Sequence, residues 1–368
     1  MRTLAIALLL AIATPAFADD EFAGATIIFA RDKSLYRVDP KGKAETEIAT
    51  LDAKKRVRNL QTDAQGKTLL VDLEGSWAWM PLDGSAKSLT PLACGDGPAQ
   101  LAEDGTCVLC RAAKGGSQII NLASGKTLTI DQPGARVTGI GADRKLVWAD
   151  KDGIWSAPPG NRKQAKKVAA DAPLRSFLPS PDGTRAVGVY SDEVYVDVHH
   201  KKPADVLMGF QLDGEGARRK GIKAGVPIVW SHDSQWVLVQ NGGEACLQHA
   251  TGGEYKCWKG YTAASLSSDG KYGLFLGTRD KKPAPEKKPD KKKKGAKPKA
   301  PDPEPTQDST EEPEGADGGE AVDDVAVPPP SGPLSLYRAK LEGSAFTETP
   351  AVVVKNIDGA AVWVPATN

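Results

Sequence analysis

The sequence predicts an all-β fold, a single β-propeller of four-stranded blades, and three observations lead to this prediction. A polar turn followed by an apolar run recurs seven times. The first four turns, anchored at residues 66, 105, 144 and 183, are each 39 residues apart. A period near 40 residues built from strands and turns is typical of a radial array of β-sheets. The chain is also rich in turn-forming residues, with 38 Gly and 27 Pro among 368 residues, which suits many short strands.

Each repeat carries the same parts in the same order. In the unit around residue 66, strands are expected over 57–60, 68–72, 76–80 and 87–90. The strand after each turn is apolar for at least three consecutive residues, which indicates that neighbouring blades cover both of its faces. The turns lie at 63–66, 104–105, 143–144, 180–183, 232–234, 268–270 and 358–359, and the runs lie at 69–71, 108–110, 147–149, 186–188, 237–239, 273–275 and 362–364.

The two ends of the chain complement each other. The N-terminal part offers strands near 26–29, 34–38 and 45–49, and the C-terminal part offers 351–355 and 361–364. Joining them in one mixed blade closes the ring and predicts seven blades. One strand is then surplus, because both ends offer a strand of the second position. Six or eight blades therefore stay open.

Residues 1–18 read as a secretory signal peptide. Arg2 supplies the positive start, residues 4–13 are mainly apolar, and Ala16-Phe17-Ala18 gives the small-x-small cleavage pattern. Cleavage before Asp19 predicts a periplasmic or secreted protein, and no lipid anchor is expected because residue 19 is not Cys. A retained N-terminal anchor is the alternative. No stretch approaches the ~20 apolar residues that a transmembrane helix needs.

The segment Ser180-Pro181-Asp182-Gly183 resembles the SPDG-type repeat of TolB-like propellers, which are also called WD40-like or PD40 repeats. Ser268-Asp269-Gly270 and His232-Asp233-Ser234 match this repeat more loosely. The resemblance spans about residues 25–278 and 334–365. It implies a propeller used mainly for protein contacts in the bacterial envelope. The N-terminal α/β domain of TolB has no counterpart here, so the partners of TolB are not transferred to this chain.

Residues 279–332 interrupt the repeat pattern. Their composition of Pro, Lys, Glu, Asp, Gly and Ala predicts disorder, because it offers little apolar area to bury. The insertion lies inside a blade, so the propeller should consist of residues 19–278 and 333–368. Its charges are segregated, with eleven Lys or Arg against three Asp or Glu over 279–299, and ten Asp or Glu with no Lys or Arg over 302–324. A tether that touches anionic polymers or lipid headgroups and a solvated spacer are both open readings.

A second basic segment lies in the fifth unit, where the spacing from 183 to 234 is 51 residues. The extra residues fall between about 199 and 225 and form either a contact site or a tolerated insertion. The candidate partner-contact residues of both segments are Lys287, Lys288, Lys291, Lys292, Lys293, Lys294, Arg218, Arg219 and Lys220.

The five cysteines predict two disulfides in an oxidising compartment. Cys246 and Cys257 are symmetric about a hairpin turn and should pair. In repeat register, Cys110 aligns with core positions and should be a buried free thiol, whereas Cys107 aligns with a more exposed position and should pair with Cys94. A redox centre of Cys107 and Cys110 is the alternative, which is disfavoured because residues i and i+3 of a strand face opposite sides.

No catalytic, cofactor-binding or metal-binding residue is assigned from the sequence. A Gly-x-Ser-x-Gly elbow and a phosphate-binding Gly loop are absent, the four histidines are scattered, and the net charge of +1 offers no field for nucleic acid. We expect a non-catalytic, monomeric platform that binds an envelope protein or an anionic envelope polymer. One alternative is a glycan-directed hydrolase or lyase at the propeller axis, although turn capping explains its candidate carboxylates. Another is a small-molecule or metal binder in the central channel.

Overall fold

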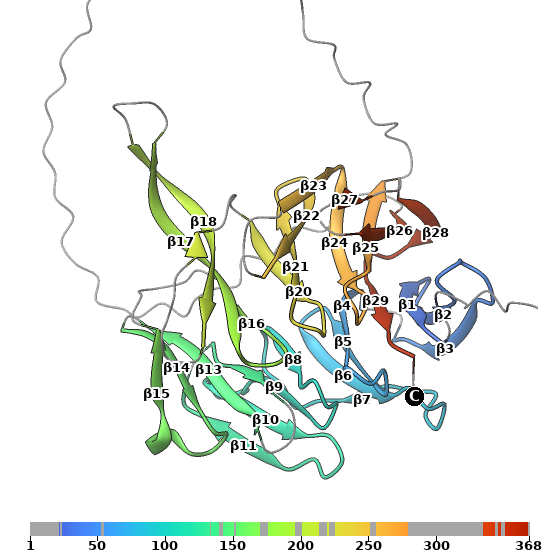
Figure 1. Cartoon of the computed structure of the whole chain (residues 1–368). Helices are drawn as coiled ribbons and strands as arrows, with labels where there is room; N and C mark the ends of the chain where they lie inside the picture. Colours follow the sequence, from blue (N-terminus) through green and yellow to red (C-terminus); the bar gives the residue numbers. More distant parts are fainter. Residues whose placement is uncertain are drawn as a thin grey trace, which may run out of the picture.

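The computed structural model is an all-β propeller of seven antiparallel blades (Figure 1). The residues that it describes are 22, 24–52, 55–132, 134–139, 143–150, 152–169, 176–195, 201–212, 219–220, 225–250, 255–278, 334–342, 345–346 and 350–366. The strands are β1 (Thr26–Arg31), β2 (Ser34–Val38), β3 (Thr46–Thr50), β4 (Val57–Thr62), β5 (Thr68–Leu73), β6 (Ser76–Pro81), β7 (Thr90–Pro91), β8 (Ala99–Leu101), β9 (Cys107–Arg111), β10 (Ser117–Asn121), β11 (Thr127–Ile130), β12 (Arg136–Thr138), β13 (Lys145–Asp150), β14 (Gly153–Ala157), β15 (Lys166–Ala169), β16 (Ser176–Pro179), β17 (Arg185–Tyr195), β18 (Lys201–Gln211), β19 (Arg219–Lys220), β20 (Val226–Trp230), β21 (Trp236–Asn241), β22 (Glu244–His249), β23 (Tyr255–Lys259), β24 (Tyr261–Leu266), β25 (Tyr272–Thr278), β26 (Leu334–Glu342), β27 (Ala345–Phe346), β28 (Ala351–Ile357) and β29 (Ala361–Val364).

We number the blades along the chain and call their strands A to D from the axis outward. Blade 1 is the mixed blade, with the order β29-β1-β2-β3. Blades 2 to 6 are β4 to β7, β8 to β11, β12 to β15, β16 to β19 and β20 to β23. Blade 7 consists of β24, β25 and β26, and its outer position is divided between β27 and β28, which both pair with β26.

The C-terminal strand resolves the surplus noted in the sequence. β29 takes the inner position of blade 1 and pairs with β1, so the run after Asp358-Gly359 is an A strand and not the second strand of a repeat. The turn at Gly359 joins blade 7 to blade 1 and has a φ of 107°, whereas Gly66, Gly105, Gly183 and Gly270 have φ values of 65–70°. Six of the seven recurring turns are therefore equivalent. The prediction of seven blades closed by both chain ends is confirmed.

Seven apolar clusters form the core, one in each interface between neighbouring blades. Successive residues of a B strand face alternate interfaces, as Leu69 and Val71 pack between blades 1 and 2 whereas Leu70 packs between blades 2 and 3. The same alternation places Leu238 on one side of β21 and its two neighbours on the other. This two-sided burial explains the continuous apolar runs of the sequence.

A hydrogen bond between a side chain and the backbone ties each blade to the next near the axis. Inner strands supply most of the partners, and Trp363 of β29 is held on both sides, by Ser265 of blade 7 and by Thr62 of blade 2. Gln61 bridges two peptide groups of β8, and Gln100 does the same to β12, so each amide satisfies a donor and an acceptor. In ring order from the interface of blades 1 and 2, the ties are made by Thr62, Gln61, Gln100, Thr138, Trp230, Gln240 and Ser265.

The strand directions divide the loops between two ends of the propeller. The A–B turns and C–D loops lie at one end, which we call the turn face, and the B–C hairpins lie at the other, the hairpin face. The long hairpin of β17 and β18 projects from the ring on the hairpin side (Figure 1). Within the described chain, no helix is long and apolar enough to cross a membrane.

Candidate interaction surface

The A–B turns of blades 5, 6 and 7 share one hydrogen-bonding pattern. A buried serine, Ser180, Ser231 or Ser267, donates its hydroxyl to the Asp two residues later and accepts the backbone N–H five residues later. The same Asp caps the turn, because its carboxylate also accepts the backbone N–H of the residue two positions after it. These bonds give the SPDG-type pattern its physical basis, because the serine and aspartate fix the turn while Gly or Ser takes the left-handed conformation at its end.

The hydrogen bonds of the turns also lower the pKa of Asp182 and Asp269. Burial opposes the charged form of each carboxylate and is the largest single influence. The hydrogen bonds from the partner serine and the turn backbone, together with Arg185 or Lys271, outweigh burial, so both pKa values fall below their ordinary value. Both groups are therefore ionised capping groups at neutral pH.

A side-chain hydrogen bond crosses the ring on the turn face. His232 Nδ1 lies 2.8 Å from a carboxylate oxygen of Glu103. Glu103 belongs to the A–B turn of blade 3 and His232 to that of blade 6, so the pair joins blades that are not neighbours. Side chains from opposite sides of the ring thus meet at this end of the axis. A second pair, Arg144 with Asp104, joins the turns of blades 4 and 3.

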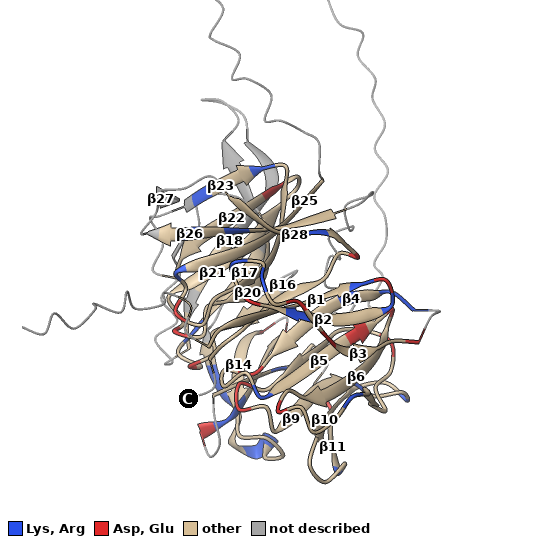
Figure 2. Cartoon of the chain, turned by 90° about the vertical axis from the view of Figure 1, so that its right-hand side faces the viewer, with Lys and Arg blue, Asp and Glu red and all other residues tan. Residues whose placement is uncertain are grey.

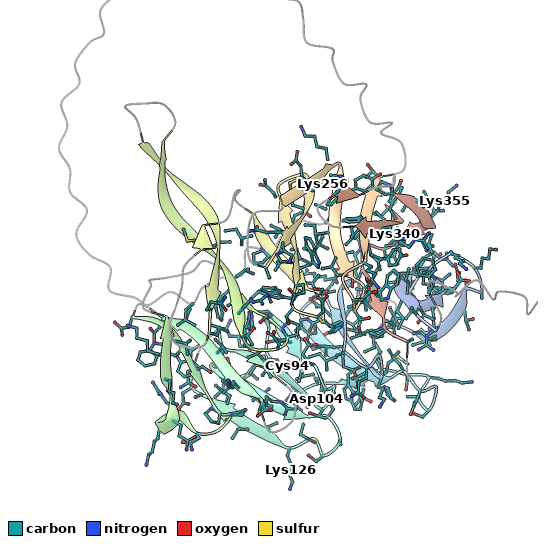
Figure 3. All side chains as sticks on the ribbon, viewed as in Figure 1. Cys94, Asp104, Lys126, Lys256, Lys340 and Lys355 are labelled. Atoms are coloured by element: carbon teal, nitrogen blue, oxygen red, sulfur yellow. A yellow bond between two sulfur atoms is a disulfide. The ribbon has the colours of Figure 1, made fainter. Side chains whose placement is uncertain are left out.

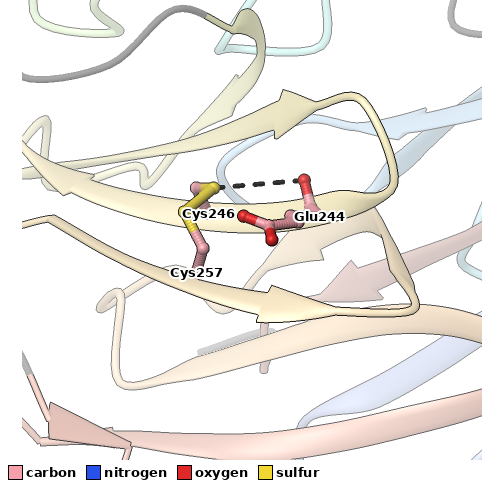
Figure 4. Close-up of side chains that lie close together, drawn as sticks. All are labelled: Glu244, Cys246 and Cys257. Atoms are coloured by element: carbon pink, nitrogen blue, oxygen red, sulfur yellow. Dashed lines mark hydrogen bonds between the residues drawn. A yellow bond between two sulfur atoms is a disulfide. The ribbon is translucent and has the colours of Figure 1, made fainter. Parts of the chain in front are cut away.

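The cysteines form two disulfides, one of which corrects the sequence prediction. Cys246 and Cys257 are register partners on β22 and β23 and are bonded, as expected (Figure 4). Cys94 is bonded to Cys110 and not to Cys107, which is a buried free thiol with 1% exposure.

The face of the strand explains the error. Cys107 and Cys110 lie on opposite faces of β9, as residues i and i+3 of a strand must. Cys110 faces the interface with blade 2, where the segment that precedes blade 3 brings Cys94, whereas Cys107 faces blade 4. Figure 3 labels Cys94, in the segment between blades 2 and 3, and Asp104, in the A–B turn of blade 3. Burial raises the pKa of the Cys107 thiol, which disfavours its reactive thiolate.

Glu244 lies beside the Cys246–Cys257 bond, and the ligand atoms of the three residues are within 4.8 Å of one another (Figure 4). Both sulfur atoms are committed to the disulfide, so neither is a thiolate that could bind a metal ion.

The partner-contact residues predicted from the sequence fall mostly outside the described residues. This holds for Arg218 and for the six lysines between Lys287 and Lys294. Arg219 and Lys220 form β19, the outer strand of blade 5. The insertion joins β25 to β26, and its flanking residues Thr278 and Leu334 are register partners in the B–C hairpin of blade 7. The two predicted contact segments therefore attach to the fold at different blades.

A compact basic surface among the described residues lies on blade 4. Arg162 and Lys163 are in the 3-10 helix η2 (Arg162–Gln164), and Lys166 and Lys167 begin β15. We call these four exposed residues the blade-4 basic strip. Residues 153–170 contain no Asp or Glu. In the described part of the chain, none of the four side chains makes an ion pair.

The strip rests on a rigid support. β15 pairs with β14, and Lys167 Nζ lies 5.8 Å from the centroid of the Trp155 ring, within the range of a cation–π contact. The indole of Trp155 in turn donates to Asp150, with an N–O distance of 3.0 Å. β15 also contacts β18 of blade 5, the strand with which β19 pairs. Elsewhere on the described ribbon, residues of both signs are interspersed (Figure 2).

No protein-family model matches the sequence, and no curated protein is similar to it. Solved structures with a similar fold include a putative TolB from Agrobacterium tumefaciens, with 11% identity, a TM-score of 0.42, and coverage of 92% of this chain and 96% of that one. The β-propeller domain of Myceliophteria thermophila Cps50 (Swd1) has 12% identity and a TM-score of 0.46, and covers 66% of this chain and 85% of its own. Kuenenia stuttgartiensis hydrazine synthase has 14% identity and a TM-score of 0.42, with coverage of 60% and 73%.

The contact residues predicted from the sequence do not include the blade-4 basic strip, although the sequence holds a signal for it. Four basic residues occur within six positions, 162–167, and a long stretch without any acidic residue surrounds them. The run is short and interrupted by Gln164 and Ala165, so it is less conspicuous than the lysine runs of the insertion. Its significance depends on the exposure of the four side chains and on their lack of ion pairs within the described chain, which the fold reveals.

Proposed function

We propose that this protein is an exported, non-catalytic propeller that binds an anionic partner in the bacterial envelope through the blade-4 basic strip. The observation that carries the proposal is the set of four exposed cations on the outer edge of blade 4, none of which forms an ion pair within the described part of the chain. Unpaired like charges repel one another and gain free energy when an anionic surface approaches. The partner is an acidic protein surface or an anionic envelope polymer.

Export is supported by two independent features. The first 18 residues carry a signal-peptide pattern. Four of the five cysteines are paired in two disulfides, which are stable in oxidising compartments and rare in the cytosol. Export would be tested by intact-mass and N-terminal peptide analysis of protein from the producing cell. The proposal predicts a mature chain that begins at Asp19, and a protein retained in the cytosol with Met1 intact would contradict it.

The test of binding compares two charge-reversed variants of equal net charge. The strip variant carries Arg162→Glu, Lys163→Glu, Lys166→Glu and Lys167→Glu. The control carries Lys33→Glu, Lys43→Glu, Lys114→Glu and Lys355→Glu, which are exposed lysines spread over other blades. Immobilised wild-type protein should retain a partner from an envelope extract, the control should retain it too, and the strip variant should lose it.

Two outcomes of that comparison would refute the binding role. Equal loss in both variants would mean that only net charge matters, and retention by the strip variant would place the partner elsewhere. Circular dichroism and thermal unfolding of each variant would verify the fold, which is expected to survive because all the substituted side chains are exposed.

The glycan-directed enzyme receives no support from the described carboxylates that motivated it. Asp104, Asp182, Asp233 and Asp269 each accept hydrogen bonds within their own turns. A capping role accounts for these side chains, so we do not propose the enzyme as a second function.

A further inference from the structure

A pocket of about 330 Å³ opens between blades 1 and 2, away from the blade-4 basic strip. Its residues come from β2 and β3 of blade 1 and from β6 and the following C–D loop of blade 2. Ile48, Met80 and Pro81 supply apolar surface, and Arg37, Glu47 and Lys87 supply the charged groups. The volume lies at the lower end of the range for small-molecule sites.

Arg37 is the unusual member of this set. Its Nη2 donates to the backbone oxygen of Leu82 at 3.2 Å, which joins the two blades. Its Nε is buried and has no hydrogen-bond partner, and no carboxylate of the described chain forms an ion pair with it. Burial lowers the pKa of this guanidinium, and within the described chain the bond to Leu82 is made without a carboxylate to balance the charge.

Glu47 is the carboxylate that would be expected to pair with Arg37, but other groups hold it. The hydroxyls of Ser34 and Thr50 both donate to its Oε1, each at 2.9 Å. Ser34 and Arg37 are residues i and i+3 of β2, so their side chains face opposite sides of the strand. Glu47 is therefore held by the Ser34 side chain and does not neutralise the guanidinium.

We propose that this pocket binds a small organic monocarboxylate, with its carboxylate on Arg37 and its apolar body against Met80 and Ile48. A guanidinium recognises a carboxylate through short charge-assisted hydrogen bonds. The apolar lining favours an aliphatic or aromatic body over a sugar or a polyol.

The experiment uses the mature full-length protein with two probes of the same shape, 4-methylpentanoate and the neutral alcohol 4-methylpentan-1-ol. Isothermal titration calorimetry and ligand-observed NMR measure their affinities. The carboxylate should bind at least about tenfold more tightly than the alcohol, because one charge-assisted hydrogen bond distinguishes them. Equal affinities, or no binding of either probe, would overturn the proposal.

Two variants locate the site. Arg37→Gln should remove the preference for the carboxylate. Because this variant also loses the bond to Leu82 between the two blades, a second variant is needed. Ala86→Leu keeps Arg37 and places a larger side chain at the lining of the pocket, so it should weaken binding of both probes while the protein stays folded. Lys126→Gln, an exposed change in blade 3, is the matched control and should bind as the wild type does. Undiminished binding in Ala86→Leu would place the ligand outside this pocket.

Discussion

At the scale of single residues, three serines fix the A–B turns of blades 5, 6 and 7. Ser180 is fully buried, and its hydroxyl lies 2.6 Å from Asp182 Oδ1 and 3.0 Å from the N–H of Arg185. Ser180→Ala should lower the free energy of unfolding by about 1–3 kcal/mol, because it leaves a buried backbone donor unsatisfied. Urea denaturation measures this change.

The control for this variant is Ser88→Ala, at an exposed serine of blade 2. Its unfolding free energy should stay within about 0.5 kcal/mol of the wild type. If Ser180→Ala were equally neutral, the hydroxyl would not be what holds the turn.

The turn carboxylates predict a pH dependence of stability. The folded pKa of Asp182 and Asp269 is lower than the ordinary 3.8, so their stabilisation is fully present above that value. It is lost as the pH falls from 3.8 through the folded pKa values, because the unfolded chain then binds more protons. Asp182→Asn should reduce the loss of stability between about pH 4 and pH 2 in equilibrium denaturation. An unchanged acid dependence would contradict the capping role.

The cysteine pairing can be checked by alkylation and mass spectrometry. Folded protein should take up no label, since its one free thiol is buried. Denatured, unreduced protein should be labelled once, at Cys107, and its digest should contain peptides linked through Cys94–Cys110 and Cys246–Cys257. A label on Cys110 would restore the pairing that the repeat register suggested.

The cysteines show which disulfides can be predicted from the sequence and which cannot. The Cys246–Cys257 bond follows from hairpin symmetry, which is a local property. The choice between Cys107 and Cys110 depends on which interface the preceding segment reaches, and that is set by the order of blades around the ring. Alignment of repeats also overstated the exposure of the Cys107 position, since Thr68 and Tyr272, which share it, are buried too.

At the scale of elements, the hairpin of β25 and β26 continues up to the insertion. Thr278 and Leu334 are register partners, so a two-residue Asn-Gly turn can replace residues 279–333 without a change of register. The shortened protein should fold and gain up to about 2 kcal/mol, because closing a long loop costs entropy. Thermal and urea unfolding measure this gain. A large loss of stability would show that the insertion is part of the folded blade.

The sequence predicted strand positions correctly where the repeat is regular. The assignment was wrong where the chain closes the ring. The apolar runs after the turns identified the B strands, because burial on both faces leaves a continuous pattern. The run 361–364 carries the same pattern, although β29 is an A strand. It is buried from both sides because Phe22 and Tyr272 pack near Trp363 in the interface with blade 7, while Val362 and Val364 face blade 2.

At the scale of the whole molecule, β29 closes the ring. Its Trp363 is hydrogen-bonded to blades 7 and 2 through the backbone, and the strand pairs with β1. Removal of residues 361–368 would open both interfaces and expose their apolar clusters. The truncated protein should lose its cooperative unfolding transition in calorimetry and bind a hydrophobic dye, whereas removal of 367–368 alone should have little effect. A truncated protein that unfolds as cooperatively as the wild type would contradict closure by this strand.

The proposed binding surface is the feature that the sequence predicted least. Long charge runs drew the prediction to the insertion and to Arg218–Lys220, whereas the described basic surface is a short strip on one rigid blade. Whether a basic segment can bind an anionic partner depends on the exposure of its side chains and on whether carboxylates pair with them. Both are set by the folded blades.

The most direct test of the account is photo-crosslinking in the producing cell. A photoreactive residue at position 163 samples the blade-4 basic strip, and one at position 114 samples the B–C hairpin of blade 3, at the other face. Both sites are exposed, so neither substitution should disturb the fold. The account predicts a specific adduct from position 163 and none from position 114. Adducts from position 114 alone, or no adduct from position 163, would show that the strip is not the binding surface.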